Sequence, residues 1–197
     1  MQPLIDHARR FGQRPEDFAR LAQGQSPAAL FITCSDSRVV PALITGARPG
    51  ELFELRTAGS IVPPYAGATP TGETATIEYA VEVLGVHDVV ICGHSHCGAV
   101  GALVRGDDLS AVPAVRDWLA HAAPGGAPAG ASGCPDDPAV ADAVRAHVLA
   151  QLLRLRSYPC VERRLASGEL RLHGWFYEVH TGAVSAYRPE SDSFESL

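Results

Sequence analysis

The stretch AALFITCSDSR, residues 28–38, joins an apolar run to a thiol, a carboxylate and a guanidinium. The run AALFITC (28–34) has no polar alternation, which is typical of a strand buried on both faces. HDVVICG (87–93) has the same character and closes on a glycine. Strands of this kind alternate with helical patterns along the chain. The sequence therefore predicts an α/β fold with a mainly parallel central sheet flanked by helices.

The remaining segments complete this fold. Helical patterns or helix-start signals occur at 3–22, 69–86, 97–104, 111–123, 136–156 and from Pro159. Extended patterns occur within 49–59 and 170–188, and the latter indicates two strands around a Thr-Gly turn. We therefore expect about four parallel strands plus an antiparallel edge strand. One domain is expected over 1–197, with an N-terminal helical arm (1–24) and a flexible Gly- and Pro-rich loop (124–135).

Composition limits the class of protein. The chain has 197 residues, of which 46% are hydrophobic, and this suits one globular domain. Its net charge of −6 argues against nucleic acid or an anionic membrane as a partner. No apolar run approaches the roughly 20 residues that cross a bilayer. The N-terminal residues carry charges throughout, without the apolar segment of an export signal, so a cytoplasmic location is expected.

Cysteine usage raises the functional question. The five cysteines favour metal binding or catalysis over disulfides in a cytoplasmic protein. Cys92 and Cys160 are best interpreted as small buried apolar residues. Cys34 does not fit a phosphatase loop, which needs an arginine where this chain has Val40. No C-x-x-C redox pair is present.

A metal site fits Cys34 better. In open α/β sheets, ligands bind outside the carboxyl ends of the strands. Cys34 ends one expected strand and His94 follows another, so the two residues can meet if their strands are neighbours. With Cys97 they form a set of two thiolates and one imidazole, which binds zinc tetrahedrally and leaves one position open. Cys134 lies beside the flexible loop, and His96 is interpreted as facing solvent or supporting the ligands.

Asp36 and Arg38 gain a purpose beside such a metal. The alternative is a surface ion pair, which contributes roughly 0–1 kcal/mol. Next to an open zinc position, a bidentate arginine keeps the carboxylate from becoming the fourth ligand. The restrained carboxylate then accepts a proton from zinc-bound water and orients the hydroxide. This arrangement suits attack on a small electrophilic carbon.

These residues resemble the hallmark of the β-class carbonic anhydrases, C-x-D-x-R followed by H-x-x-C, here CSDSR and HSHC. The resemblance extends through RTAGSIVPPYAG, TIEYAVEVLGV and CGHSHCGAV and returns at LHGWFYEVHTG. It implies one Zn²⁺ per chain on Cys34, His94 and Cys97, and an Asp36–Arg38 dyad. It also implies reversible hydration of carbon dioxide to bicarbonate and a proton, with zinc hydroxide as the nucleophile. The expected assembly is a homodimer or a dimer of dimers, with active sites at the subunit interface.

The resemblance also distinguishes two subtypes. The plant-like, open subtype lines its pocket with a Gln, a Phe and a Tyr, some from the partner chain, and these match Gln25, Phe53 and Tyr79. The other subtype has a tryptophan where this chain has Phe31, as part of an inhibitory bicarbonate pocket with an arginine and a tyrosine that Arg56 and Tyr177 could match. We therefore expect the open subtype, with Asp36 paired to Arg38 near neutral pH and no cooperative inhibition by bicarbonate.

Two further pocket residues and two alternatives complete these expectations. Gln25 and the backbone N–H of Gly98 are expected to donate to the developing oxyanion. Ala58 stands where the plant-like pocket often has valine, which leaves hydrolysis of carbonyl sulfide or carbon disulfide as an alternative reaction. A noncatalytic zinc-binding or sensor module is the other alternative. The intact Asp36 and Arg38 argue against it, because a closed structural zinc needs neither.

Overall fold

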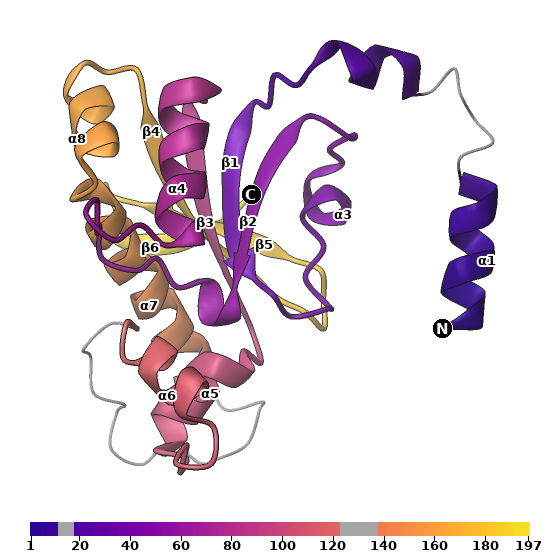
Figure 1. Ribbon diagram of the computed structural model, residues 1–197. Helices are drawn as coiled ribbons and strands as arrows, with labels where there is room; N and C mark the ends of the chain where they lie inside the picture. Colours follow the sequence, from indigo (N-terminus) through magenta and orange to yellow (C-terminus); the bar gives the residue numbers. More distant parts are fainter. Residues whose placement is uncertain (12–17, 123–137) are drawn as a thin grey trace.

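A six-stranded sheet forms the centre of the computed structural model, which describes residues 1–11, 18–122 and 138–197 (Figure 1). The strands lie in the order β2-β1-β3-β4-β5-β6. Their bounds are Ala29–Cys34 (β1), Leu52–Thr57 (β2), Asp88–His94 (β3), Arg171–Tyr177 (β4), Val184–Arg188 (β5) and Ser193–Ser196 (β6). The first four in this order are parallel, and β5 and β6 are antiparallel. The predicted α/β fold is confirmed, with β6 as an additional edge strand that the sequence did not indicate.

β1 lies between two other strands and is buried on both faces, which explains its apolar sequence. It pairs with β2 on one side and β3 on the other, so both of its backbone edges are occupied. Leu30 and Ile32 are fully buried, as are Val89 and Ile91 on β3. A strand covered on both faces needs no polar alternation. The buried Thr33 hydroxyl satisfies its polarity by donating to the Cys92 carbonyl at 2.9 Å.

Helices and short helical turns connect and cover these strands. Their bounds are Gln2–Phe11 (α1), Ala19–Gln23 (η1), Pro41–Thr45 (α3), Ala58–Ser60 (η2), Gly72–Glu78 (α4), Tyr79–Val83 (η3), Gly98–Arg105 (α5), Pro113–Leu119 (α6), Pro138–Arg156 (α7) and Pro159–Ala166 (α8). The predicted helices after β3 therefore occur in the predicted order. Among the described residues, no helix has both the length and the apolar character needed to cross a membrane. The loop predicted at 124–135, with Cys134, lies outside the described residues.

Glycines bring α7 close to the sheet. A methyl group on Gly93 of β3 would lie 2.6 Å from Val144 and 2.7 Å from Val148, both on α7. The corresponding distance at Gly174 on β4 is 3.0 Å to Leu152. Real side-chain atoms do not approach so closely, so a larger residue at Gly93 would push the helix outward. The close contact places the N-terminal half of α7 behind the strand end that carries His94.

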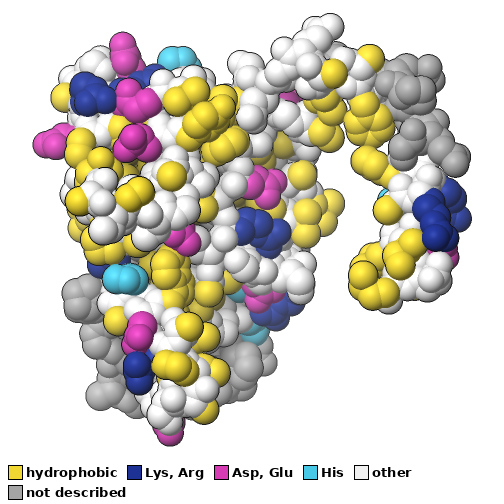
Figure 2. Space-filling model, in the orientation of Figure 1, with side chains coloured by type: hydrophobic (Ala, Val, Ile, Leu, Met, Phe, Trp, Pro, Cys, Tyr) yellow, Lys and Arg dark blue, Asp and Glu magenta, His cyan; other side chains and the backbone are white. Residues whose placement is uncertain are grey.

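The N-terminal arm differs from the prediction of one surface helix at 3–22. Within that range α1 ends at Phe11, and the next described turn is η1; residues 12–17 lie outside the description. No residue of α1 is buried in the single chain, and Leu4 is 68% exposed. Figure 1 shows α1 standing away from the sheet, and Figure 2 shows hydrophobic side chains on its surface. The apolar face that the sequence predicts therefore exists, but the described chain does not cover it.

Candidate metal centre

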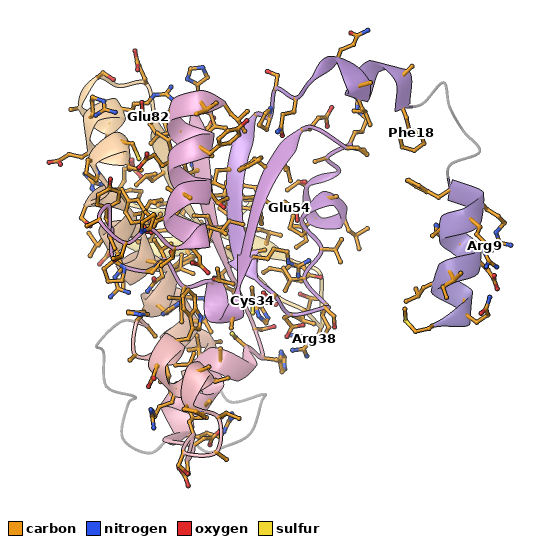
Figure 3. All side chains as sticks on the ribbon, in the orientation of Figure 1. Arg9, Phe18, Cys34, Arg38, Glu54 and Glu82 are labelled. Atoms are coloured by element: carbon orange, nitrogen blue, oxygen red, sulfur yellow. The ribbon has the colours of Figure 1, made fainter. Side chains whose placement is uncertain are left out.

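Three potential metal ligands meet at the carboxyl end of the sheet. Cys34 is the last residue of β1, and His94 is the last residue of β3. Cys97 lies three residues further, immediately before α5. The parallel pairing of β1 and β3 brings these strand ends together, and the two sulfur atoms and an imidazole nitrogen lie within 4.8 Å of one another. Figure 3 shows Cys34 and Arg38 at this end of the strands.

His94 is oriented as a metal ligand. Its Nδ1 lies 2.8 Å from the Ser95 carbonyl oxygen, which only accepts hydrogen bonds, so Nδ1 carries the proton. The lone pair is then on Nε2. That atom is buried and has no hydrogen-bond partner among the described residues. A buried nitrogen acceptor of this kind fits a divalent cation, because metal-bound histidines commonly donate their other N–H to a carbonyl.

The sulfur atoms provide the charge that such a cation requires. The neighbouring Cys97 and His94 side chains and the backbone N–H groups of Asp36 and Gly59 lower the pKa of Cys34 despite burial. The neighbouring Cys34 thiolate and burial raise the pKa of Cys97. Of the two thiols, Cys34 is therefore the more readily ionised. Two buried sulfur atoms and one imidazole nitrogen form a donor set that suits zinc.

Asp36 is paired with Arg38 beside this cluster. One carboxylate oxygen accepts from the Arg38 backbone N–H and from Nε, each at 2.9 Å, and the other accepts from Nη2 at 2.7 Å. These bonds hold the pKa of Asp36 well below its usual range. Arg38 Nη2 also donates to the carbonyl of His96 at 3.1 Å. The guanidinium therefore connects the CSDSR loop to the loop that follows His94.

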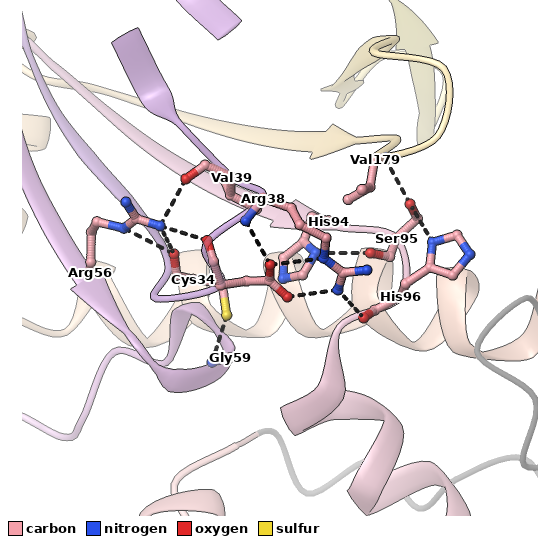
Figure 4. Close-up of polar contacts among 10 residues, drawn as sticks. Cys34, Arg38, Val39, Arg56, Gly59, His94, Ser95, His96 and Val179 are labelled. Carbon is pink, nitrogen blue, oxygen red and sulfur yellow. Dashed lines mark hydrogen bonds and ion pairs between the residues drawn. The ribbon is translucent and has the colours of Figure 1, made fainter. Parts of the chain in front are cut away.

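Arg56 holds the other side of the CSDSR loop (Figure 4). Its guanidinium donates to the carbonyl of Cys34 at 3.0 and 3.1 Å, to that of Asp36 at 2.7 Å and to that of Val39 at 2.8 Å. The sequence matched Arg56 to an anion-pocket residue of the other subtype. Here its guanidinium is occupied by backbone carbonyls. Phe31, at the tryptophan position of that subtype, is buried and makes an edge contact with Trp175.

The predicted pocket residues fall into two groups. Gly98 follows Cys97 as the first residue of α5, and Ala58 directly precedes the Gly59 N–H that contacts Cys34. These two lie next to the cluster. The rings of Phe53 and Tyr79 contact each other, with centroids 5.9 Å apart, but Phe53 pairs with Leu30, four residues before the end of β1.

Phe53 and Tyr79 therefore do not join the metal ligands of their own chain. With about 3.3 Å per strand residue, the register places Phe53 some 13 Å back along the sheet. Gln25 is exposed in the segment before β1. The single chain thus brings together the metal ligands, the dyad, Ala58 and Gly98, but leaves the aromatic pair at a distance.

Sequence reasoning missed the residues that support Cys34. The Gly59 N–H lies 3.4 Å from the Cys34 sulfur. Trp118 and His147 donate to the carbonyl oxygens of Ala58 and Gly59, each at 2.9 Å. These contacts come from helices distant in sequence, so no local motif indicates them. The one signal in the sequence is His147 itself, a histidine between Ala146 and Val148 in the helical pattern.

The chain is similar to proteins named carbonic anhydrases. A model of the carbonic anhydrase family matches residues 29–184. A carbonic anhydrase of Pseudomonas aeruginosa is 49% identical and covers 100% of this chain and 92% of its own length. One from Synechococcus elongatus is 44% identical and covers 93% of this chain and 70% of its own length.

Solved structures show the same fold. The structure of the beta-carbonic anhydrase CcaA has a TM-score of 0.87 and 38% identity, and covers 100% of this chain and 99% of its own. One of two tetrameric beta-carbonic anhydrases from Sordaria macrospora has a TM-score of 0.74 and 28% identity, with coverage of 94% and 92%. The similarity in sequence and in fold thus extends over nearly the whole chain.

Proposed function

The chain belongs to the β-class carbonic anhydrases, and from that premise we propose that Cys34, His94 and Cys97 hold a zinc ion with which it hydrates carbon dioxide to bicarbonate and a proton. Two observations carry this proposal: His94 Nε2 is buried without a partner in the described chain, and an imidazole nitrogen of His94 lies within 4.8 Å of two cysteine sulfur atoms. Bound zinc supplies the Lewis acidity that makes water nucleophilic near neutral pH.

Asp36 and Arg38 orient the attacking water in this proposal. The Asp36 carboxylate remains ionised, because its hydrogen bonds with Arg38 hold its pKa well below the usual range. An ionised carboxylate accepts a hydrogen bond from water and so orients it. Three bonds to Arg38 keep the same carboxylate turned away from the metal ligands. This pairing supports an open site near neutral pH, in which the fourth metal position is available to water.

Charge that develops on the substrate oxygen needs a donor. Gly98 begins α5, where backbone N–H groups lack partners within the helix. The positive end of the helix dipole adds to their attraction for an anion. We assign the Gly98 N–H to the substrate oxygen. Gln25 has the same role in the site of a partner copy, because it precedes β1 and so lies at the opposite end of that strand from Cys34. Ala58 is assigned to the wall of the same pocket.

A second copy of the chain completes the pocket in this proposal. The aromatic pair of Phe53 and Tyr79 lies about 13 Å back from the strand end of its own chain, so it cannot line that chain's own metal site. Tyr79 is 45% exposed and thus available to a partner. The exposed apolar residues of α1 provide a surface for the same contact. The proposed assembly is a homodimer or a dimer of dimers.

The assembly is tested by light scattering of the purified full chain. A Leu4→Glu, Phe11→Glu variant places charge on the exposed apolar face of α1 and should shift the mass toward the monomer. Activity should fall in parallel, because the aromatic pair leaves the pocket. Arg9→Glu on the same helix is the matched control, since Arg9 is a solvated charge that pairs with Asp6. A wild-type protein that is fully active as a monomer would contradict this part of the proposal.

The reaction itself is tested by stopped-flow hydration of carbon dioxide. The zinc-loaded protein should be active, a chelated sample inactive, and re-addition of zinc should restore the rate. Release of hydrogen sulfide from carbonyl sulfide is measured in parallel, and a higher kcat/KM for that substrate would favour the alternative reaction. Zinc-loaded protein without either activity would reject the proposal. A cytoplasmic location belongs to the same proposal, because a reducing compartment keeps the cysteine ligands as thiols.

A further inference from the structure

The turn η2 touches the metal centre through one backbone group. The Gly59 N–H donates to the Cys34 sulfur at 3.4 Å. Gly59 and the following Ser60 both have positive φ, 74° and 58°. Serine adopts this left-handed conformation at a cost, and such conformations persist where the surrounding structure fixes them. The position of the N–H at Cys34 therefore depends on the side chains that hold this turn.

Trp118 holds the peptide group that carries this N–H. Its indole N–H donates to the carbonyl of Ala58 at 2.9 Å. The Ala58 carbonyl and the Gly59 N–H belong to one trans peptide, so they point in opposite directions. A continuous hydrogen-bonded chain thus runs from the indole through this peptide to the Cys34 sulfur. Donation to the carbonyl polarises the peptide and makes its N–H a stronger donor.

The adjoining peptide is fixed from a different helix. His147 on α7 is 5% exposed, and its Nε2 donates to the carbonyl of Gly59 at 2.9 Å. Burial lowers the pKa of His147, so the ring stays neutral, with its one proton on Nε2. The hydroxyl of Ser60 donates to the Cys92 carbonyl at 3.1 Å. With these contacts in place, the Trp118 bond sets the tilt of the Ala58–Gly59 peptide.

We propose that Trp118 is a positioning residue for the Cys34 sulfur: its indole N–H orients and polarises the Ala58–Gly59 peptide, and thereby tunes the sulfur as a zinc ligand. The inference rests on the proposed zinc site. A hydrogen bond from N–H stabilises the sulfur lone pairs. Partners behind the ligands of a metal typically change its affinity by about 10–100-fold when removed. Trp118 acts through one intervening peptide, so an effect of about 10-fold is expected.

The test compares the chain's two tryptophans. Trp118→Phe removes the N–H and keeps an aromatic ring, and Trp175→Phe makes the same change on β4. In the cobalt-substituted protein, Trp118→Phe should shift the sulfur-to-cobalt charge-transfer band to lower energy, because the sulfur lone pairs are less stabilised. Zinc affinity, measured by competition with a chelator, should fall about 10-fold. The Gly59 amide should exchange its hydrogen faster in the metal-free protein. Trp175→Phe should leave all three unchanged.

Specific outcomes would overturn the proposed role of Trp118. A folded Trp118→Phe protein with a wild-type band and wild-type Gly59 exchange would overturn it, as would equal shifts in Trp175→Phe. If Trp118→Phe does not fold, benzothienylalanine replaces Trp118 in the Trp175→Phe background, since sulfur takes the place of N–H in a ring of the same shape. A wild-type protein that binds neither cobalt nor zinc rejects the proposed function. The Gly59 exchange in metal-free protein still decides whether Trp118 fixes the peptide.

Discussion

Two aspartate–arginine pairs lie at opposite ends of the same sheet. Asp88 is the first residue of β3, and the last residue of that strand, His94, belongs to the metal centre. Asp88 accepts from Arg171 Nε at 2.8 Å and from Nη2 at 2.7 Å. The bonds between Asp36 and Arg38 have nearly the same lengths. Local pair geometry is therefore shared, and it does not by itself determine what each pair does.

The surroundings of the two pairs differ. Asp36 and Arg38 lie two residues apart in a loop beside two cysteine sulfur atoms. Asp88 and Arg171 are register partners on β3 and β4, so their pair joins two strands. Within the described ranges, the ligands at the Cys34 end form the one cluster of three or more residues that could hold a metal. We infer that one pair serves chemistry and the other serves stability, and four predictions test this division.

The largest difference in effect between substitutions at the two ends of the sheet should come from removing a proposed metal ligand. Cys97→Ser replaces a buried sulfur donor with a hydroxyl, a much poorer zinc ligand at neutral pH. Zinc content and activity should fall together, activity by more than about 100-fold, the upper end of what supporting residues cost. Metal analysis and stopped-flow kinetics measure both. Cys92→Ser is the control, a buried cysteine on β3 that should keep its zinc. A fully zinc-loaded Cys97→Ser protein would remove Cys97 from the site.

The next effect should come from Asp36→Asn. The amide has the shape of the carboxylate but no charge, so it is a weaker hydrogen-bond acceptor and holds the attacking water less well; the rate should fall on the order of 10²-fold. Zinc content should remain at one per chain, which separates this variant from the ligand variants. Arg38→Ala should lose activity for a different reason, because Asp36 is then free to approach the metal. Near-normal hydration by either variant would make the pair structural, like the one at Asp88.

Asp88→Asn is expected to have a smaller effect, which lowers stability slightly and leaves activity unchanged. This change removes the charge that Arg171 and His173 contact, His173 at 2.7 Å, and leaves the metal centre untouched. Arg171 is 69% exposed and Asp88 25% exposed, so water screens the pair, and the melting temperature at pH 7 should fall by only about 2 °C. kcat/KM should equal that of the wild type. A large loss of activity in this variant would show that the two ends of the sheet are coupled.

The smallest expected effect is the change with pH of the difference in melting temperature between wild type and Asp88→Asn. Hydrogen bonds from Arg171 lower the pKa of Asp88 in the folded state. A carboxyl whose folded pKa is depressed contributes stability above its unfolded pKa, about 3.9, and loses it as pH falls through the folded value. The difference in melting temperature between wild type and Asp88→Asn should thus be constant from pH 7 to 5 and shrink below about pH 4. A difference that grows in acid would contradict this assignment.

The sequence indicated the elements that local patterns control. Apolar runs predicted the strands β1 and β3. Because Cys34 and His94 lie at the ends of these runs, the sequence also predicted that the two residues meet. Asp36 and Arg38 were predicted because their pairing is local. Ser193–Ser196 was not recognised as a strand, since SFES is short and polar and its pairing with β5 depends on tertiary structure.

Contacts between elements that are distant in sequence could not be predicted from sequence patterns. The roles of Trp118 and His147 require α6 and α7 to meet the turn at Gly59, and no spacing rule places helices against a particular turn. Arg56 was matched to an anion pocket by position, and only the folded chain shows that carbonyl groups occupy it. For α1 the amphipathic pattern was correct, but a pattern does not say whether the partner surface belongs to the same chain.

The strand order also affects how the enzyme is made. β1 is synthesised first of the strands, yet its neighbours β2 and β3 follow later, and α7, which bonds to Gly59, comes after most of the chain. Parallel pairing between distant segments is slow to form. Cys34 is therefore synthesised well before Cys97, at a stage when its strand neighbours are not yet available. Metal loading at the proposed site is therefore expected late in synthesis, because its three ligands come together only after β1 and β3 have paired.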